Sequence, residues 1–243
     1  MAAHKLRDCA IFVDGFLISA VSNVVRLNQS AEAVDLTCLG NTTKVHGGGL
    51  LSWEASIEGF VEYGAAALEA MLAARLASVK PIGLVPAETG TIAVGDLAYF
   101  GSGLLKAAAA PSGAAGEYER FTLPIEGGAG PLVRGVVARV HGTAGGSATS
   151  AALNLGAVPA GSRLWAAAFC RSLTGSAVAV AIETDTASNF PSAVTALSLS
   201  SLTAAGEAVI GSVAGPITDT YQRAVVTVTG TEWDGLILVG ISS

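Results

Sequence analysis

The stretch SWEASIEGFVEY, residues Ser52–Tyr63, alternates between apolar and polar side chains with a period of two. Successive side chains of a β-strand point to opposite faces, so this pattern predicts a strand with one apolar face and one acidic face. The acidic column contains Glu54, Glu58 and Glu62. It also contains Phe60, an aromatic side chain that a neighbouring strand or subunit should cover.

The three glutamates of this strand cannot form a glycosidase pair among themselves. Neighbouring glutamates are four residues apart, which is about 13 Å at a strand rise of about 3.3 Å per residue. A pair of catalytic carboxyl groups lies within about 10 Å. Two interpretations stay open: a solvated outer face, or a lining that faces a polyanion.

The hydrophobic period changes after this strand from two to the helical value. Apolar residues recur at helical spacings in an alanine-rich context, and Lys80–Pro81 is a stop signal; the apolar positions are Leu68, Met71, Leu72, Leu76 and Val79. We therefore predict one α-helix at about residues 64–79, packed on a sheet.

The segment before the alternating strand is polar and shows no clear period. It runs from Gln29 to Gly49 and ends in three glycines, so we expect a loop there, following a short strand at Val24–Asn28. A loop of that length is unusual inside a compact domain and is often functional. It is the first candidate for contact with another subunit.

The rest of the chain reads as short strands separated by Gly, Pro and Ser turns. The predicted strands are Ile82–Pro86, Leu97–Ala109, Glu117–Glu126 and Leu132–His141, and then Leu164–Arg171, Ala177–Glu183, Ala193–Leu199, Tyr221–Thr229 and Leu236–Ile241. The composition of Gly142–Ser150 is typical of a linker. We therefore predict a mainly β protein with domains at residues 1–143 and 144–243, the second a sandwich or jelly roll.

The charge balance argues against a protein that grips nucleic acid. The net charge is -6 and the 13 basic residues are scattered, whereas phosphate neutralisation needs clustered Lys and Arg. The three cysteines form no CxxC pair, which favours reduced thiols. No signal peptide or bilayer-spanning stretch stands out, so we expect a soluble, non-secreted protein with no membrane association.

No residue pattern points to catalysis, a cofactor or a metal. His4, His46 and His141 are dispersed, whereas a metal site needs converging ligands. A dyad of Cys38 and His46 can be imagined, but proximity in sequence does not supply the orientation that nucleophilic catalysis needs. We predict no enzymatic activity, no cofactor and no metal.

The order of features resembles a known family. The segment CAIFVDGFLIS, followed by VDLTCLGNTTKVHGGGLLSWEASIEGFVEYG, is similar to the opening of a tail tube protein of a long-tailed bacteriophage. GEYERFTLPIEGGAGPLVRG and the late LGAVPAGSRLWAAAF and ITDTYQRAVVTVTGTEWDGLILVGI resemble the rest of larger phage tail proteins. The matching residues of the opening are Asp14, Gly15, Ser19, Asp35, Thr37, Gly40, Gly49, Leu50, Ser56, Gly59, Phe60 and Gly64.

The resemblance implies a tail-tube-like β-sandwich or barrel with one packed helix, extended here by a second β-sandwich half. Residues 144–243 are then either a second all-β domain or an elaboration of the tube fold. Such subunits form hexameric rings that stack into a tube, and their long hairpins join into an inner barrel through which DNA passes. The implied partners are further copies of the chain, a tape measure protein and a tail terminator. The implied location is the virion tail, after assembly in the host cytoplasm.

Two groups of residues become candidate sites under this resemblance. An acidic wall would let DNA slide without sticking; the candidate lining residues are Glu54, Glu58, Glu62, Glu117 and Glu119. The long loop would contact the next ring; the candidate contact residues are Gln29, Asp35, Thr37, Asn41, Lys44 and His46.

The alternative is a binding protein. In a jelly-roll carbohydrate-binding or virion decoration protein, the second half of the chain would hold the ligand. Trp165 and Trp233 would then provide the sugar-stacking face.

Overall fold

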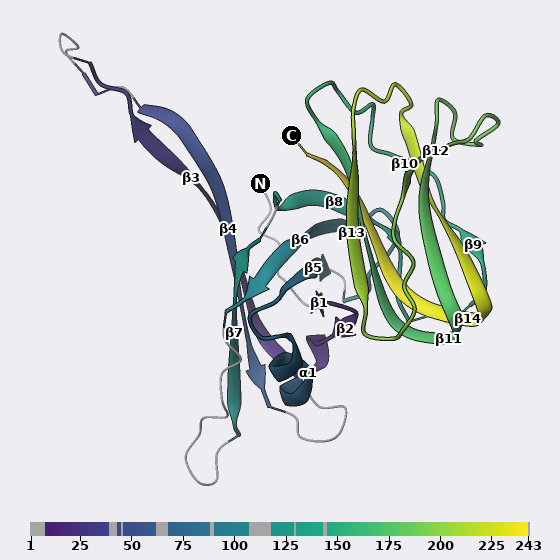
Figure 1. Cartoon of the computed structure of the whole chain (residues 1–243), viewed down its shortest axis with the longest axis horizontal. Coiled ribbons are helices and arrows are strands. Elements are labelled where there is room, and N and C mark those ends of the chain that lie inside the picture. Colours follow the sequence, from purple (N-terminus) through teal and green to yellow (C-terminus); the bar gives the residue numbers. More distant parts are fainter. Residues whose placement is uncertain are drawn as a thin grey trace. The chain divides into compact units, whose positions relative to one another are not determined.

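The computed structural model describes residues 8–38, 43–44, 46–61, 68–87, 90–106, 118–128, 130–142 and 145–242. The chain is mainly β, and α1 (Leu68–Arg75) is the one α-helix in these ranges, as Figure 1 shows. Both features confirm the predicted fold class. Contacts divide the chain into unit 1 (Met1–Ala20, Lys80–Ser102 and Val133–Ser243) and unit 2 (Val21–Val79 and Gly103–Leu132), which differs from the predicted division at residues 143 and 144.

Unit 2 is built on an antiparallel hairpin of β3 (Ser22–Asp35) and β4 (His46–Phe60). The strand β7 (Arg120–Gly127) pairs with β4 on its other side. The last residues of β6 (Leu97–Leu105) then pair with β7. The order β3-β4-β7-β6 places β4 between two neighbours over Glu54–Phe60, which is the alternating part of the sequence.

The predicted alternation of β4 is confirmed. Trp53, Ala55 and Ile57 are buried, whereas Ser52 and Glu54 are exposed. The facing strand β7 alternates in step, with Phe121, Leu123 and Ile125 buried. Hydrophobic burial of this one face therefore fixes the register of β4 against β7, because a one-residue slip would expose every apolar side chain.

The helix is shorter than predicted. It ends at Arg75, because Ala77 adopts a left-handed φ of 58° and the backbone then crosses to β6. There Ala77 N–H donates to Leu105 C=O at 2.9 Å, and Leu105 N–H donates to Ser78 C=O at 3.2 Å. Val79 begins β5 (Val79–Ala87) and so belongs to a strand. Residues 64–67 lie outside the described residues.

Unit 1 holds most of the remaining strands. Their order includes β12-β11-β14-β8-β6-β5-β1-β2, with β9 and β10 on β14 and β13 on β11. The elements not yet given are β1 (Asp8–Val13), β2 (Phe16–Leu17), the 3-10 turn Ser19–Val21, β8 (Val133–Arg139), β9 (Ala148–Thr149), β10 (Leu153–Asn154), β11 (Arg163–Asp185), β12 (Val194–Ser198), β13 (Ala208–Ala214) and β14 (Tyr221–Ser242).

Four segments predicted as separate short strands form two long strands in the structure. Leu164–Arg171 and Ala177–Glu183 belong to β11, and Tyr221–Thr229 and Leu236–Ile241 belong to β14. The polar and glycine residues between them form irregularities in a continuous β11–β14 pairing rather than turns. At one of these, Gly230 lies against Gly175 with a φ of 149°, where an added Cβ would stand 2.4 Å from the Gly175 Cα.

The segment Gly142–Ser150 is not a free linker where it is described. Gly145 forms a β-bridge with Trp233, and β9 pairs with β14. The hydroxyl of Ser147 accepts the Val228 N–H at 2.9 Å. Its small polar residues therefore serve as hydrogen-bond partners along β14.

A tight turn at Asp14–Gly15 joins β1 to β2. The buried Asp14 carboxylate accepts the Ala208 N–H at 2.8 Å and lies 3.1 Å from the Lys80 ammonium. A Cβ at Gly15 would stand 2.4 Å from the Cys170 C=O. Only glycine fits this close backbone approach.

Ile57→Ala tests the buried face of β4. Ile57 has no exposed surface, so its truncation should lower the free energy of unfolding by about 2–5 kcal/mol. Ser56→Ala on the opposite face should change it by about 0.5 kcal/mol or less. Urea unfolding measures both, and equal effects at the two positions would contradict the assigned faces.

Candidate functional site: the hairpin arm

The β3–β4 hairpin continues past the end of β7. Because β7 pairs with β4 only from Glu54 to Phe60, the stretch His46–Trp53 has β3 as its one partner among the described strands. That stretch has about eight residues, or about 26 Å of strand. Figure 1 shows the hairpin extending beyond β7. We call its described residues 30–38, 43–44 and 46–52 the arm.

The predicted loop at Gln29–Gly49 is therefore wrong over Gln29–Asp35 and His46–Gly49, which belong to strands. Ala31 lies opposite Leu51 and Asp35 lies opposite His46 in a paired ladder. The β3 residues of the arm are exposed on both faces of the ribbon. With neither face selected for burial, the sequence shows no period of two, although the strands are present.

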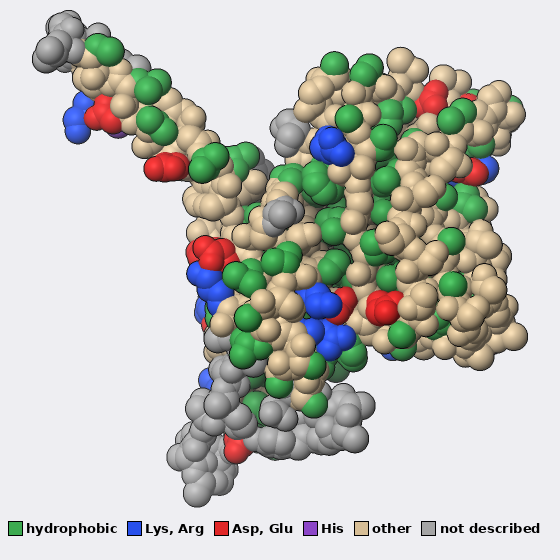
Figure 2. All heavy atoms as spheres, viewed as in Figure 1, with side chains coloured by type: hydrophobic (Ala, Val, Ile, Leu, Met, Phe, Trp, Pro, Cys, Tyr) green, Lys and Arg blue, Asp and Glu red, His purple; other side chains and the backbone are tan. Residues whose placement is uncertain are grey.

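The arm exposes apolar side chains and unpaired strand edges. The exposed fractions are 40% for Val34, 54% for Leu36, 80% for Leu50 and 67% for Leu51. Figure 2 shows apolar side chains spread along the arm. Among the described strands, β3 pairs with β4 only, so its outer edge presents free backbone groups. Long exposed edges and apolar patches of this kind mark association surfaces.

Polar cross-strand pairs hold the hairpin near the arm's base. The hydroxyl groups of Ser30 and Ser52 lie 2.9 Å apart, and Asn28 Nδ2 donates to Glu54 Oε1 at 3.2 Å. Below these pairs, the Arg26 guanidinium forms an ion pair with Glu58. Each pair spans both strands, so the arm's base is fixed by side chains as well as by backbone.

The predicted contact residues spread along the arm from base to tip. Gln29 lies at the base opposite Trp53, whereas Asp35, Thr37, Lys44 and His46 lie toward the tip. The hydroxyl and backbone N–H of Thr37 donate to the Asp35 carboxylate, and they hold its pKa below its usual range. Asn41 lies outside the described residues.

The predicted lining glutamates stand on a mixed face. Glu54 is exposed and Glu58 is half-buried on the outer face of β4, and Glu119 precedes β7, where its C=O accepts the Val61 N–H at 3.0 Å. Glu62 and Glu117 lie outside the described residues. Arg26 forms an ion pair with Glu58 on this face, and Lys106 forms one with Glu126.

Arg120 adds a third positive charge beside Phe60. Its guanidinium lies 5.9 Å from the centre of the Phe60 ring, and the Tyr118 ring packs edge-on at 5.8 Å. These contacts give Phe60 partial cover, and 37% of it stays exposed. The outer face of β4 and β7 therefore alternates both signs of charge, and the sequence had indicated only the acidic one.

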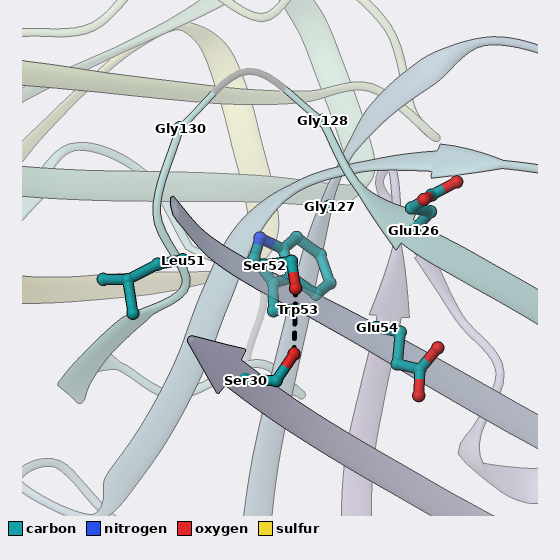
Figure 3. A pocket seen from close by; sticks show the side chains of 9 residues that line it. All are labelled: Ser30, Leu51, Ser52, Trp53, Glu54, Glu126, Gly127, Gly128 and Gly130. Carbon is teal, nitrogen blue, oxygen red and sulfur yellow. Dashed lines mark hydrogen bonds between the residues drawn. The ribbon is translucent and has the colours of Figure 1, made fainter. Parts of the chain in front are cut away.

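A pocket of about 230 Å³ lies at the base of the arm, where β4 loses β7 as a neighbour. Figure 3 shows its lining, which is Ser30, Leu51, Ser52, Trp53, Glu54, Glu126, Gly127, Gly128 and Gly130. Trp53 Nε1 is buried and has no hydrogen-bond acceptor among the described residues. A Cβ at Gly127 would stand 2.7 Å from that nitrogen, so glycine is required beside the indole.

The sequence reasoning missed this pocket. Its two halves come from segments more than seventy positions apart, and neither carries a recognisable motif. The one local signal is the glycine run that directly follows β7.

Other candidate chemistry is limited in the described residues. They contain no group of three or more His, Cys, Asp and Glu side chains placed to hold a metal ion. None of their helices is long and apolar enough to cross a membrane. Trp233 is fully buried, so it offers no face for a sugar to stack on. Trp165 is partly buried and packs against a core cluster.

Comparison with known proteins gives distant structural similarity. No family model and no curated protein matches the chain. A chain from the virion of a native gene transfer agent particle is 17% identical, with 54% of this chain and 98% of that chain covered and a TM-score of 0.43. The SPP1 Dit (gp 19.1) protein, described as a hub adsorption apparatus of phages that infect Gram-positive bacteria, is 13% identical, with coverages of 97% and 99% and a TM-score of 0.38.

Removing the arm should separate folding from association. Residues 32–50 can be replaced by Asn-Gly, which forms a tight hairpin turn between the register partners Ala31 and Leu51. Because the arm buries little apolar surface, the melting temperature should change by less than about 4 °C. Self-association, measured by sedimentation velocity, should be lost. Unchanged association, or an unfolded variant, would contradict the arm's assigned role.

Proposed function

We propose that this chain is a structural subunit of a phage-type virion tail. Its copies form hexameric rings, the rings stack into a tube, and DNA passes through the tube without specific binding. The subunit has no enzymatic activity. The arm is the observation that carries the proposal.

The arm of an isolated subunit would leave free strand edges and apolar side chains in water, and both favour association over a monomer. A two-stranded ribbon alone is marginally stable in water, and its free edges are templates for pairing with another chain. The arm adds four largely exposed leucine and valine side chains to those edges. Contact with further copies would cover both the backbone edge and the apolar surface.

The glycines of the family resemblance support the same proposal, because they occupy positions that the packing requires. A Cβ at Gly59 would stand 2.0 Å from the Val21 C=O. A Cβ at Gly49 would stand 2.9 Å from the Glu32 C=O, within the arm itself. Gly49 and Gly59 thus belong to the hairpin and its root.

The mixed charges on the outer face of β4 and β7 suit a wall that DNA slides past. Glu58 and Glu126 are neutralised by Arg26 and Lys106, and Glu54 keeps a negative charge. A wall without a cluster of unpaired Lys and Arg releases few counterions from DNA, so it holds the phosphates weakly. We assign this face to the lumen.

Negative-stain microscopy of the purified protein at high concentration tests the proposal. Hollow tubes, or rings with six-fold symmetry, are the expected result. A monomer at every concentration, combined with measurable glycan binding, would favour the carbohydrate-binding alternative and overturn the tube.

Glu58→Lys tests the lumen assignment. The change leaves Arg26 and the new lysine side by side and repeats a positive band around each ring, so phosphates should be held. Tubes should still form, DNA ejection from particles should slow, and added salt should relieve the delay. Glu58→Gln, which adds no positive charge, is the matched control. If Glu58→Lys particles ejected DNA at the wild-type rate, the assignment of this face to the lumen would be wrong.

A further inference from the structure

We propose that the tip of one copy's arm docks into the pocket at the base of another copy's arm. The contact joins Lys44 at the tip to Glu54 at the base. This inference rests on the proposed function, since it says how successive rings hold one another.

The pocket has an uncompensated negative charge. Glu54 and Glu126 are register partners on adjacent strands, so their side chains share one face at close range. Like charges in that position are destabilising. Lys106 forms an ion pair with Glu126, whereas the one hydrogen bond that Glu54 receives from the described side chains comes from the neutral amide of Asn28. The base therefore lacks one cation.

The tip provides a cation and an apolar side chain. Lys44 is exposed, and no described carboxylate forms an ion pair with it. Leu36, which directly follows β3, is 54% exposed and packs over Gly47, where a Cβ would stand 2.7 Å from its Cδ1. Leu51, 67% exposed, provides a matching apolar wall in the pocket.

Trp53 lines the pocket as its buried aromatic side chain. It is 95% buried, since 5% of its surface is exposed, and its indole N–H has no acceptor among the described residues. Buried donors are normally satisfied in folded proteins. Gly127 lies directly against this nitrogen, so the indole N–H is enclosed within the subunit.

A tip that enters the pocket comes from another copy. Tip and base are parts of one extended hairpin, separated by about 26 Å of paired strand, so a tip cannot fold back to its own base. A tip-to-base contact joins two different surfaces and is therefore heterologous. Repeated in one direction it produces an open stack, as ring stacking requires.

A charge exchange tests the contact. Lys44→Glu and Glu54→Lys should each place like charges together and convert tubes into single rings. The double variant Lys44→Glu/Glu54→Lys restores the pair and should restore tubes. Glu232→Lys, the same change at an exposed position of β14, should leave tubes unchanged. Tube length by negative-stain microscopy is the readout, and circular dichroism confirms folding.

Native Cys38 provides an independent measurement. It is exposed at the tip, whereas Cys9 and Cys170 are buried, and burial raises the pKa of each thiol to about 11. With Ser52→Cys at the base, mild oxidation by copper-phenanthroline should yield a ladder of cross-linked chains. Ser188→Cys, exposed on unit 1, should yield none.

The outcomes separate the two proposals. Wild-type tubes that persist in both single charge variants, or a double variant that stays as rings, would overturn the tip-to-base contact and leave the tube in place. An absent Ser52→Cys ladder would also overturn the contact. If the wild-type protein formed neither tubes nor rings but the Ser52→Cys variant still formed the cross-linked ladder, the tube would be overturned and the contact would stand.

Discussion

The number of hydrogen-bonding neighbours of β4 decides the architecture of unit 2. Over Glu54–Phe60 the strand is paired on both sides, and its apolar face is buried with that of β7. From Trp53 toward His46 it has β3 alone. One continuous strand is therefore core at one end and exposed ribbon at the other, and the pocket lies where the change occurs.

The sequence predicts the strand where one face of β4 is buried. It fails to predict a strand where neither face is buried. The alternation of Ser52–Tyr63 indicates both faces correctly over its described residues because apolar side chains must point to one side. The described residues of Gln29–Gly49 have no buried side, so polar and apolar residues follow no order and the segment resembles a loop. The long strands β11 and β14 are missed for a related reason, since their irregularities carry the glycines and polar residues that usually mark turns.

The candidate site shows the same limit. Its exposed glutamates are predictable from parity along one strand. Their partners are not, because Arg26 is 32 positions from Glu58 and Lys106 comes from the end of another strand. Charge complementarity across a sheet depends on register, and register follows from the whole set of strands. The acidic wall of the sequence therefore becomes a mixed surface in the fold.

The stability of the arm and its proposed contact with a second copy depend on the same residues. A free two-stranded ribbon gains little from hydrophobic burial, while fixing each backbone residue costs about 1–2 kcal/mol. The base offsets part of this cost through the Ser30–Ser52 and Asn28–Glu54 pairs and the sheet below them. Toward the tip such support is lost, and exposed Leu36 and Leu50 add apolar surface that water does not favour. Covering that surface with a second copy would stabilise the arm and the proposed contact together, so the same residues that make the free arm unfavourable would favour the proposed stack.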